Sequence, residues 1–392
     1  MTPAARVQAA IEVLDLVIVA ARAQGAPADR IIAEWFRPRR FAGSGDRRAV
    51  RDLVYASIRR CGEVPASGRA AMLRLAADDP ALTALFDGSP HAPAPIAPDE
   101  RRADAGPAPR WLTKLLKASD IAGEEAAALL ERAPLDVRVN TLKADRDTIR
   151  LPLAGEPTVA PYGLRFPHGA PVEKWDVALD GVIEVQDTGS QLACLAVGAA
   201  PGEAVIDLCA GAGGKTMALA AAMANRGRLL ACDTDRGRLS RLPPRAARAG
   251  ATIIETRLLD PGREAGALSD WRERADAVLV DAPCSGTGTW RRNPEVRWRL
   301  TRDSLARLTA LQARLLDLAA TLVRPGGRLL YVVCSLLDGE GADQVARFLA
   351  RHPGWAAERP PLTAGVERGP GLRLTPAHDG TDGFFIARLV RL

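Results

Sequence analysis

The stretch that decides the fold is Val205-Ile206-Asp207-Leu208-Cys209-Ala210-Gly211-Ala212-Gly213-Gly214-Lys215. An apolar strand ends in an acidic residue, and a run of small residues then turns the chain into an alanine-rich helix expected over 215–225. Glycines permit a tight turn and a close approach of the backbone to a ligand. The N-terminus of the helix directs its free N–H groups and the positive end of its dipole toward that ligand. This arrangement is typical of the nucleotide-type cofactor site of a doubly wound α/β sheet.

The turn departs from the two phosphate-binding patterns that it most resembles. A P-loop reads G-x-x-x-x-G-K-[ST], and aligning its end on Gly214, Lys215 and Thr216 puts Cys209 where the first glycine belongs. The dinucleotide fingerprint G-x-G-x-x-G, started at Gly211, reaches Thr216 at its sixth position. The stretch alone therefore predicts a cofactor site without naming the cofactor.

Composition and charge set the broad class of the protein. A chain of 392 residues, 47% of them hydrophobic, is long enough for two or three domains with buried cores. Its net charge of +6 is compatible with an anionic partner. The six cysteines lack C-x-x-C spacing, which argues against zinc or a disulfide framework and suits a reducing cytoplasm. No apolar run reaches the length of a membrane span. We expect a cytoplasmic monomer that holds no metal and crosses no membrane.

The predicted elements divide the chain into four parts. Residues 1–87 show only helical periodicity and predict an all-α domain. Residues 88–109 are rich in proline and alanine and predict a linker. Residues 110–186 mix short helical and strand patterns and predict a small α+β module. Residues 187–392 alternate strands with helices, which predicts a parallel sheet with its ligands at the carboxyl ends of the strands.

The alternation in the last part can be followed element by element. The double proline Pro243-Pro244 should kink or shorten one helix. The C-terminal run 384–390 should close the sheet as an antiparallel strand. The expected strands are 203–208, 228–232, 252–256, 277–281 and 328–333, and the expected helices are 215–225, 236–250, 303–323 and 341–351.

The all-α part carries eight arginines in two runs. A solvated face of an arginine-rich protein and an RNA-binding face both explain this pattern, and the sequence leaves the choice open. The residues are Arg37, Arg39, Arg40, Arg47, Arg48, Arg51, Arg59 and Arg60.

Two acidic residues follow later strands at positions that suit an adenosine. Asp233 ends the second strand of the main domain, where a carboxylate can hold both hydroxyls of a ribose. It could instead cap the next helix, with Asp235 beside it. Asp260 comes just after the third strand, within reach of an adenine. NAD and S-adenosylmethionine share this geometry, and the strand end D-x-C-x-G at 207–211 favours S-adenosylmethionine.

Two cysteines fall at the carboxyl ends of neighbouring predicted strands. Cys284 follows Asp281-Ala282-Pro283 and precedes a loop of small residues that can expose a thiol. Cys334 precedes a predicted helix, whose N-terminus would lower the pKa of the thiol. Cysteine is also a common small core residue, so position alone assigns no role. The surrounding residues make these two the candidate reactive thiols.

A reactive thiol has a specific use in one kind of methyl transfer. Carbon 5 of a pyrimidine, unlike a nitrogen or oxygen acceptor, is too weak a nucleophile to attack a sulfonium methyl group. Addition of a thiolate at carbon 6 makes the ring an enamine whose carbon 5 can attack. Asp281 is placed to act as the acid at ring nitrogen N3. A base must then remove the proton from carbon 5.

Residues 110–392 resemble a known family. Their motifs are similar to those of the RsmB/Nop/Sun family of RNA (cytosine-5) methyltransferases, and the two-cysteine arrangement is the most specific similarity. The all-α part is similar to the NusB-like RNA-binding domain of the bacterial ribosomal-RNA branch. The matching motifs are PRWL (109–112), RVNTLK (138–143), VQDTGSQLA (185–193), DLCAGAGGKT (207–216), DAPCSGTGTWRRNPEVRW (281–298), YVVCS (331–335) and DGTDGFFIA (379–387).

The resemblance implies a fold, a reaction and a set of site residues. The fold is a class I methyltransferase Rossmann-like sheet, preceded by the small α+β module and the all-α NusB-like domain. The reaction is methylation of cytosine carbon 5 by S-adenosylmethionine, with small-subunit ribosomal RNA as the expected substrate and partner. Cys334 is the implied nucleophile, and Cys284 is implied to assist product release. The implied cofactor-binding residues are Cys209, Ala210, Gly211, Ala212, Gly213, Gly214, Lys215, Asp233, Asp260 and Asp281.

The chain departs from the family pattern at three places. Val333 stands where the family has threonine, and Ala212 stands where it has proline. Asp338-Gly339-Glu340-Gly341 replaces Pro-Glu-Glu-Asn in the loop after Cys334. None of the three removes a chemical group from the mechanism, and the last leaves open whether the altered loop changes activity.

The segment after Cys284 predicts contacts with RNA. Arginines pair with phosphates, and Trp290 or Trp298 could stack on a displaced base or, equally well, belong to a core. The predicted RNA-binding residues are Arg291, Arg292, Arg297 and Trp298.

Two other functions remain as alternatives to methylation of ribosomal RNA. One is a ribosome-assembly or RNA-binding factor that has lost catalysis, against which both cysteines and Asp281 argue. The other is a dehydrogenase with the same sheet, against which the missing dinucleotide fingerprint argues. Within the methyltransferase hypothesis, transfer RNA is the alternative substrate.

Overall fold

The computed structural model describes all 392 residues, from Met1 to Leu392. Its contacts divide the chain into two compact units. The helical unit contains Met1–Glu131 and Thr289–Thr301, and the sheet unit contains Arg132–Gly288 and Arg302–Leu392. This division differs from the expected four parts in two respects. Residues 110–131 group with the N-terminal helices, and residues 289–301 return to the helical unit from within the main domain.

The helical unit consists of helices that hydrophobic periodicity predicts. Thr2 caps the first one, since its hydroxyl oxygen accepts a hydrogen bond from the N–H of Ala5 at 3.2 Å. Residues 68–83 form two helices and not one, because Asp79 caps a new start and Pro80 cannot continue the preceding helix. The helices are α1 (Pro3–Arg22), α2 (Ala28–Phe36), α3 (Ser44–Arg60), α4 (Gly68–Ala76), α5 (Pro80–Thr83), α6 (Arg110–Ala118), α7 (Glu124–Ala128) and α14 (Val296–Arg299).

Residues 88–109 have almost no regular structure, as expected of a linker, but they are attached to the helices. The N–H of Ala103 donates to the carbonyl of Ala70 at 3.0 Å, and an isolated bridge joins Cys61 to Ala105. Arg69 forms an ion pair with Glu100. These contacts make the segment part of the helical unit.

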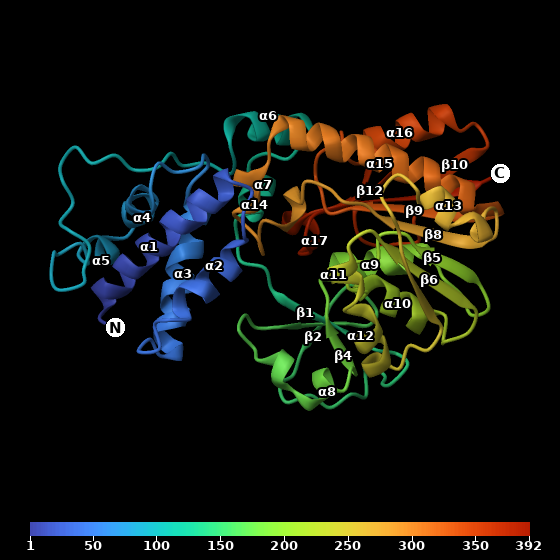
Figure 1. Cartoon of the computed structure of the whole chain (residues 1–392), viewed down its shortest axis with the longest axis horizontal. Coiled ribbons are helices and arrows are strands. Elements are labelled where there is room, and N and C mark those ends of the chain that lie inside the picture. Colours follow the sequence, from blue (N-terminus) through green and yellow to red (C-terminus); the bar gives the residue numbers. More distant parts are fainter. The chain divides into compact units, whose positions relative to one another are not determined.

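The segment Thr289–Thr301, which we call the return segment, completes the core of the helical unit. Its helix α14, drawn in orange, lies beside the blue helix α1 (Figure 1). Trp298 belongs to the same hydrophobic cluster as residues of α1 to α4. The fully buried guanidinium of Arg297 donates to the carbonyls of Ile58 at 2.6 Å and Cys61 at 2.9 Å. The return segment is therefore a structural component of a unit built mostly by the first third of the chain.

The first part of the sheet unit is a small antiparallel sheet with the strand order β2-β3-β1-β4. Asn140, just after β1, donates to the carbonyl of Ala249 at 2.7 Å and thereby fastens this sheet to the main domain. The Asp136 carboxylate accepts from the Thr188 hydroxyl at 2.6 Å. The strands are β1 (Leu135–Val139), β2 (Glu156–Pro157), β3 (Gly163–Phe166) and β4 (Ile183–Val185), and the helix α8 (Asp176–Leu179) precedes β4.

The main sheet has nine strands in the order β11-β12-β13-β9-β8-β5-β6-β7, with β10 also paired to β13. The strands β7, β6, β5, β8 and β9 are mutually parallel, and β13 pairs antiparallel with β9, as the sequence predicts. The strands are β5 (Ala204–Asp207), β6 (Arg228–Asp233), β7 (Ile254–Leu258), β8 (Ala275–Asp281), β9 (Val323–Val333), β10 (Trp355–Glu358), β11 (Val366–Arg368), β12 (Gly371–Leu374) and β13 (Phe384–Arg391).

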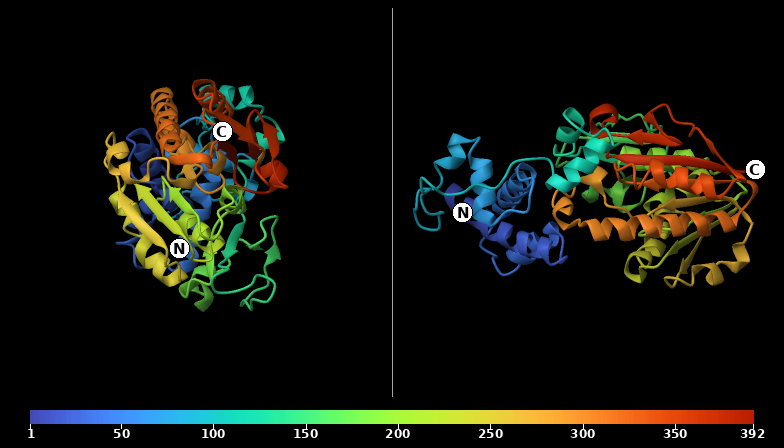
Figure 2. Two further views of the ribbon diagram at one scale, coloured as in Figure 1. Left: turned by 90° about the vertical axis from the view of Figure 1, so that its right-hand side faces the viewer. Right: turned by 90° about the horizontal axis from the view of Figure 1, so that it is seen from above.

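Helices cover both faces of the main sheet, with α15 and α16 on one face and α9, α10 and α12 on the other (Figures 1 and 2). Successive residues of a central strand enter opposite cores: Leu279 packs with α9 and α10, and Val280 packs with α15. The helices are α9 (Thr188–Val197), α10 (Gly214–Ala222), α11 (Arg236–Leu239), α12 (Leu242–Ala249), α13 (Glu264–Ala267), α15 (Arg302–Leu322), α16 (Ala342–Arg351) and α17 (Pro376–Asp379).

The expected helix over 236–250 is divided into α11 and α12. Pro243 and Pro244 lie in the first turn of α12, where the missing N–H groups cost no intrahelical hydrogen bond. None of the helices combines the length and apolar character that a membrane span requires. The double-wound architecture confirms the expected α/β fold class and directs the carboxyl ends of β5, β6, β8 and β9 to one edge.

Candidate active site

The glycine-rich turn lies between β5 and α10, as the sequence predicts. Gly211 and Gly213 have positive φ angles of 55° and 87°, a backbone region that residues with a Cβ rarely enter. Helix α10 begins at Gly214 without a side-chain cap, so its first N–H groups are directed into the turn. This is the geometry that suits the polar and anionic parts of a nucleotide-type cofactor.

Asp233 supports this turn from the end of β6. Its Oδ2 accepts from the N–H of Gly211 at 2.7 Å, and its Oδ1 accepts from the N–H of Asp235 at 2.7 Å. Asp235, not Asp233, caps helix α11, because its carboxylate accepts from the N–H of Arg238 at 3.0 Å. A carboxylate has about four acceptor positions, so Asp233 keeps capacity for hydroxyl donors such as those of a ribose. Asp260 lies in an exposed position just after β7.

Asp207, at the end of β5, is fully buried. Its Oδ2 accepts from the Thr216 hydroxyl at 2.7 Å, whereas its Oδ1 has no hydrogen-bond partner. Burial in this poorly solvated position raises the pKa of Asp207 to about 7. A buried carboxylate oxygen without a donor is the kind of group that a bound polar ligand can satisfy.

Lys215, in the first turn of α10, forms an ion pair with Asp281 at the end of β8. The Nζ–Oδ2 distance is 2.7 Å, and the side chains are 13% and 30% exposed. Burial alone would lower the pKa of Lys215, but the adjacent Asp281 carboxylate raises it above its ordinary value. The pair therefore keeps a proton-bearing ammonium next to a partly accessible carboxylate.

The two candidate thiols lie next to each other. Strands β8 and β9 are neighbours, and Asp281 pairs in register with Val332, so the residues just beyond each strand reach the same edge of the sheet. The Sγ atoms of Cys284 and Cys334 are 3.3 Å apart, and both residues are partly accessible. The hydrogen bond with the Cys334 thiol, followed by burial, raises the pKa of Cys284 well above its ordinary value.

The helix predicted after Cys334 is present, separated from the cysteine by a loop. Helix α16 begins at Ala342, well beyond Cys334, with a loop between them. Cys334 therefore does not lie in the first turn of that helix, where the effect of the helix dipole on a side chain is strongest.

The loop after Cys334 contributes a residue that sequence reasoning treated only as part of a departure from the family pattern. Glu340 is fully buried, and its carboxylate accepts from the hydroxyl of Ser335, the residue after Cys334, at 2.6 Å. The available signal in the sequence was a glutamate between two glycines, Gly339 and Gly341. Only the structure shows that its side chain turns inward.

The predicted RNA contacts lie in the return segment, and the structure corrects this prediction. Arg297 and Trp298 are 0% and 5% exposed and belong to the interior of the helical unit, so neither side chain can reach RNA directly. Arg291 is also buried, at 5% exposed, and its carbonyl accepts from Arg59 at 3.0 Å. Arg292 is partly exposed. The alternative that the tryptophans belong to a core is the correct one, since Trp290 is 0% exposed.

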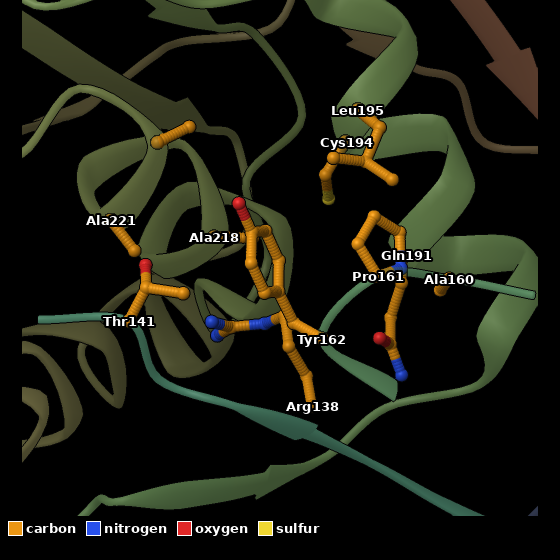
Figure 3. Close-up of a pocket in the computed structure, with 11 residues that line it drawn as sticks. Arg138, Thr141, Ala160, Pro161, Tyr162, Gln191, Cys194, Leu195, Ala218 and Ala221 are labelled. Atoms are coloured by element: carbon orange, nitrogen blue, oxygen red, sulfur yellow. The ribbon is translucent and has the colours of Figure 1, made fainter. Parts of the chain in front are cut away.

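A separate small cavity lies between β1, α9 and α10 (Figure 3). Its volume is about 30 Å³, room for a water molecule but not for an adenosine. Arg138, which lines it, is 5% exposed and donates to Gln186 Oε1 at 2.7 Å. This cavity is distinct from the edge that holds the glycine-rich turn and the thiols.

Comparisons with known proteins place this geometry in context. A family model described as 16S rRNA methyltransferase RsmB/F matches residues 194–390, half of the chain. Ribosomal RNA small subunit methyltransferase B of Pasteurella multocida is 33% identical over 289 residues, which cover 72% of this chain and 64% of that protein. The protein of the same name from Xylella fastidiosa (strain Temecula1) is 37% identical over 298 residues, covering 72% and 67%. The chain thus spans about two thirds of the length of these curated relatives.

A solved structure extends the likeness to both units. The crystal structure of PH0851 superimposes with a TM-score of 0.76 at 26% identity and covers 99% of each chain. The likeness includes Met1–Glu131 of the helical unit, which lie outside the residues that the family model matches.

Proposed function

Because the chain belongs to the RsmB/F family of 16S rRNA methyltransferases, we propose that it methylates carbon 5 of a cytosine in small-subunit ribosomal RNA. The methyl donor is S-adenosylmethionine. Cys334 forms the covalent bond to the base, and Cys284 assists release of the product.

The observation that carries this proposal is the pair of thiols 3.3 Å apart beside the Lys215–Asp281 ion pair. Methyl transfer to nitrogen or oxygen requires no thiol, and a disulfide framework is absent because all six cysteines are free. Transfer to carbon 5 of a pyrimidine does require a nucleophile at carbon 6. Two adjacent thiols at the ligand-binding edge of the sheet therefore favour this reaction over the two alternative functions.

The two thiols have different roles because their surroundings differ. The raised pKa of Cys284 keeps it protonated near neutral pH, and it can donate a hydrogen bond to the sulfur of Cys334. A hydrogen bond to a thiolate favours the charged, nucleophilic form. Cys334 then adds to carbon 6 of the cytosine, and the electrons of the 5,6 double bond make carbon 5 nucleophilic. After methylation, a base removes the proton from carbon 5, the electrons of that C–H bond restore the 5,6 double bond, and the Cys334–carbon bond breaks to give back the Cys334 thiolate. Cys284 assists this elimination by its hydrogen bond to the departing sulfur.

Asp281 and Lys215 are the residues that we assign to ring nitrogen N3 of the cytosine. Addition at carbon 6 makes ring nitrogen N3 strongly basic, and N3 takes up a proton as negative charge develops. Asp281 is the group assigned to donate that proton to N3, and the Lys215 ammonium at 2.7 Å stabilises the carboxylate that is left. The pair therefore supplies both a hydrogen-bonding partner and a proton at a partly exposed position.

S-adenosylmethionine, when bound, supplies the methyl group as an electrophilic sulfonium. The residues that would hold it are those of the glycine-rich turn from Cys209 to Lys215, with Asp233 for the ribose and Asp260 for the adenine. The positive φ angles of the turn, the uncapped start of α10 and the unpartnered oxygen of Asp207 all fit such a ligand. Cys209 packs against the core, and burial raises the pKa of its thiol well above the ordinary value, so we assign it no chemistry.

The helical unit is the proposed RNA-binding part. Six of its eight clustered arginines are exposed, and four of these form no ion pair: Arg37, Arg40, Arg47 and Arg48. Cations that are not neutralised by carboxylates on the same surface are available for phosphates. This favours the RNA-binding interpretation of the cluster and replaces the return segment as the predicted contact surface.

The covalent step can be tested by trapping. Cys284→Ala should accumulate a covalent protein–RNA adduct with small-subunit ribosomal RNA, seen as a slower band under denaturing conditions. The adduct should disappear in the double variant that also carries Cys334→Ala. If Cys334→Ala alone still transfers labelled methyl groups, Cys334 is not the nucleophile.

The substrate can be tested independently of the mechanism. Bisulfite sequencing of ribosomal RNA from a deletion strain should show the loss of one methylated cytosine in the small subunit. Loss of a modified position in transfer RNA, with ribosomal RNA unchanged, would contradict the proposed substrate and leave the chemistry intact.

A further inference from the structure

A cluster of buried polar side chains includes the residues that directly follow the two cysteines. It consists of Ser285, Thr287, Gln312, Ser335 and Glu340, and each is 2% exposed or less. The residues come from four places in the sheet unit: the loop after β8, helix α15, the end of β9 and the loop before α16. A polar cluster this deeply buried destabilises a fold unless its members satisfy one another.

The carboxylate of Glu340 is the common partner within this cluster. Its Oε1 accepts from the N–H of Ser285 at 2.9 Å and from Gln312 Nε2 at 3.0 Å. Its Oε2 accepts from the hydroxyl of Ser335 at 2.6 Å and from the hydroxyl of Ser285. Four donors reach one carboxylate, and none of them carries a positive charge. The backbone of Glu340 is fixed as well, because its carbonyl accepts from the Tyr331 hydroxyl at 2.7 Å.

The Glu340 carboxylate is connected to the two thiols through the residues that donate to it. Ser285 directly follows Cys284, and Ser335 directly follows Cys334. Glu340 therefore ties together the two residues next to the two thiols, although their loops lie 50 residues apart in the chain. Gln312 extends the same connection to the residue before Cys284, since its Nε2 also donates to the carbonyl of Pro283 at 2.9 Å.

Two backbone hydrogen bonds also hold the loop that follows Cys284. The N–H of Gly288 donates to the carbonyl of Cys334 at 3.1 Å, and the N–H of Gly383 donates to the carbonyl of Gly288 at 2.8 Å. A Cβ at Gly288 would lie 2.1 Å from the carbonyl oxygen of Gly383, so only glycine permits this approach. Among the side chains, the Thr287 hydroxyl joins the same two loops at one point, since it accepts from the N–H of Leu336 at 2.8 Å. The Glu340 carboxylate joins them through Ser285 and Ser335, the residues that directly follow the two thiols.

We propose that Glu340 is a positioning residue that holds Cys284 and Cys334 at their 3.3 Å separation by accepting hydrogen bonds from the residue that follows each of them. Its catalytic consequence rests on the proposed function, since only a reaction that uses both thiols requires this separation. The geometric part does not, and it can be tested without RNA or a methyl donor.

The geometric test uses the rate at which the two thiols form a disulfide with the azo oxidant diamide. Two thiols become one disulfide, and their two protons and two electrons reduce the azo group of diamide to a hydrazine. The rate depends steeply on how often the sulfur atoms meet in a suitable arrangement. Peptide mapping by mass spectrometry under non-reducing conditions assigns the bond to Cys284 and Cys334.

We expect Glu340→Gln to slow this disulfide formation by about tenfold or more, because an amide replaces one carboxylate oxygen beneath the two serine hydroxyls. Ser335→Ala, which removes one donor and leaves a small side chain, should slow it less, and it provides a second variant if Glu340→Gln folds poorly. Glu264→Gln is the matched control: Glu264 is a buried carboxylate of the same unit that pairs with Arg314, and its substitution should leave the rate unchanged. Rates within twofold of wild type in folded Glu340→Gln and Ser335→Ala would overturn the proposal.

Methyl-transfer kinetics give the second readout. Glu340→Gln should lower kcat while KM for RNA stays within about twofold, because the RNA-binding surface is unchanged. A slowed disulfide with normal kcat would confirm the positioning role and contradict the proposed use of both thiols. A normal disulfide rate with reduced kcat would contradict the positioning role and leave the proposed function standing.

Discussion

Replacing Trp298 by alanine should destabilise the helical unit, although this residue follows the sheet-unit cysteine Cys284 by only 14 positions. The Trp298 side chain is 5% exposed and packs among residues of α1 to α4. A buried tryptophan removes about 200 Å² from water, which corresponds to roughly 5 kcal/mol of transfer free energy. Its indole N–H is buried and has no hydrogen-bond partner, which is unfavourable in the wild-type fold. Removing this donor therefore offsets about 1 kcal/mol of the lost transfer free energy. We expect a net loss of about 3–4 kcal/mol in the free energy of unfolding, within the usual range for this substitution.

Amide hydrogen exchange followed by mass spectrometry separates the two units. In Trp298→Ala, the slowest amides of α1 and α3 should exchange about 100-fold faster or more, because each 1.4 kcal/mol is a factor of ten. Trp271→Ala is the matched control, since Trp271 is 1% exposed, lies in the core of the sheet unit and also has an unpaired indole N–H. It should accelerate exchange in the main sheet instead. Unchanged exchange in α1 and α3 of Trp298→Ala would refute the reasoning that the return segment completes this core.

Three other changes have defined outcomes. Because the pKa of Asp207 is raised to about 7 from the ordinary 3.8, the folded state holds its proton over a pH range in which the unfolded state has lost it. Stability should therefore fall as pH rises from about 4 to about 7, by at most roughly 4 kcal/mol, and urea unfolding at pH 5 and pH 8 should show a smaller difference in Asp207→Asn. Lys215→Met removes the cation paired with Asp281 and should lower kcat for methyl transfer by roughly 10²-fold, whereas an unchanged kcat would exclude the pair from the chemistry. The double variant Arg40→Gln, Arg48→Gln should reduce the slope of log affinity against log salt for RNA by up to about 2, and a slope equal to that of wild type would move the RNA-binding surface elsewhere.

The arrangement at the edge of the main sheet could be predicted from the sequence because it depends on local signals. Alternating strands and helices give a parallel sheet, and the residues just beyond neighbouring strands then meet at one edge. Cys284 and Cys334 were placed together on this reasoning, and the structure brings their sulfur atoms to 3.3 Å. The same logic located the glycine-rich turn and Asp233. The roles of these residues remain predictions.

The residues that sequence reasoning misplaced depend on contacts between distant parts of the chain. Arg297 and Trp298 follow Cys284 in an arginine-rich run, and nothing local indicates that they enter a core built by residues 1–87. Glu340 was noted only within a departure from the family pattern, because a carboxylate in a loop is ordinarily exposed. The three strands β10 to β12 at the edge of the sheet were missed as well, since short edge strands have weak periodicity.

The return segment also has a consequence for how the protein is made. The ribosome finishes helices α1 to α7 by residue 128, but Arg297 and Trp298 follow only after the strands up to β8 have been synthesised. At about 5–20 residues per second, the first helices wait roughly 10–30 s for the side chains that complete their core. During that interval the hydrophobic surface that will receive Trp298 is uncovered on the nascent chain. The helical unit, whose first helices are synthesised before the sheet unit, is thus among the last parts to finish folding, and these helices are where a nascent-chain chaperone would be needed.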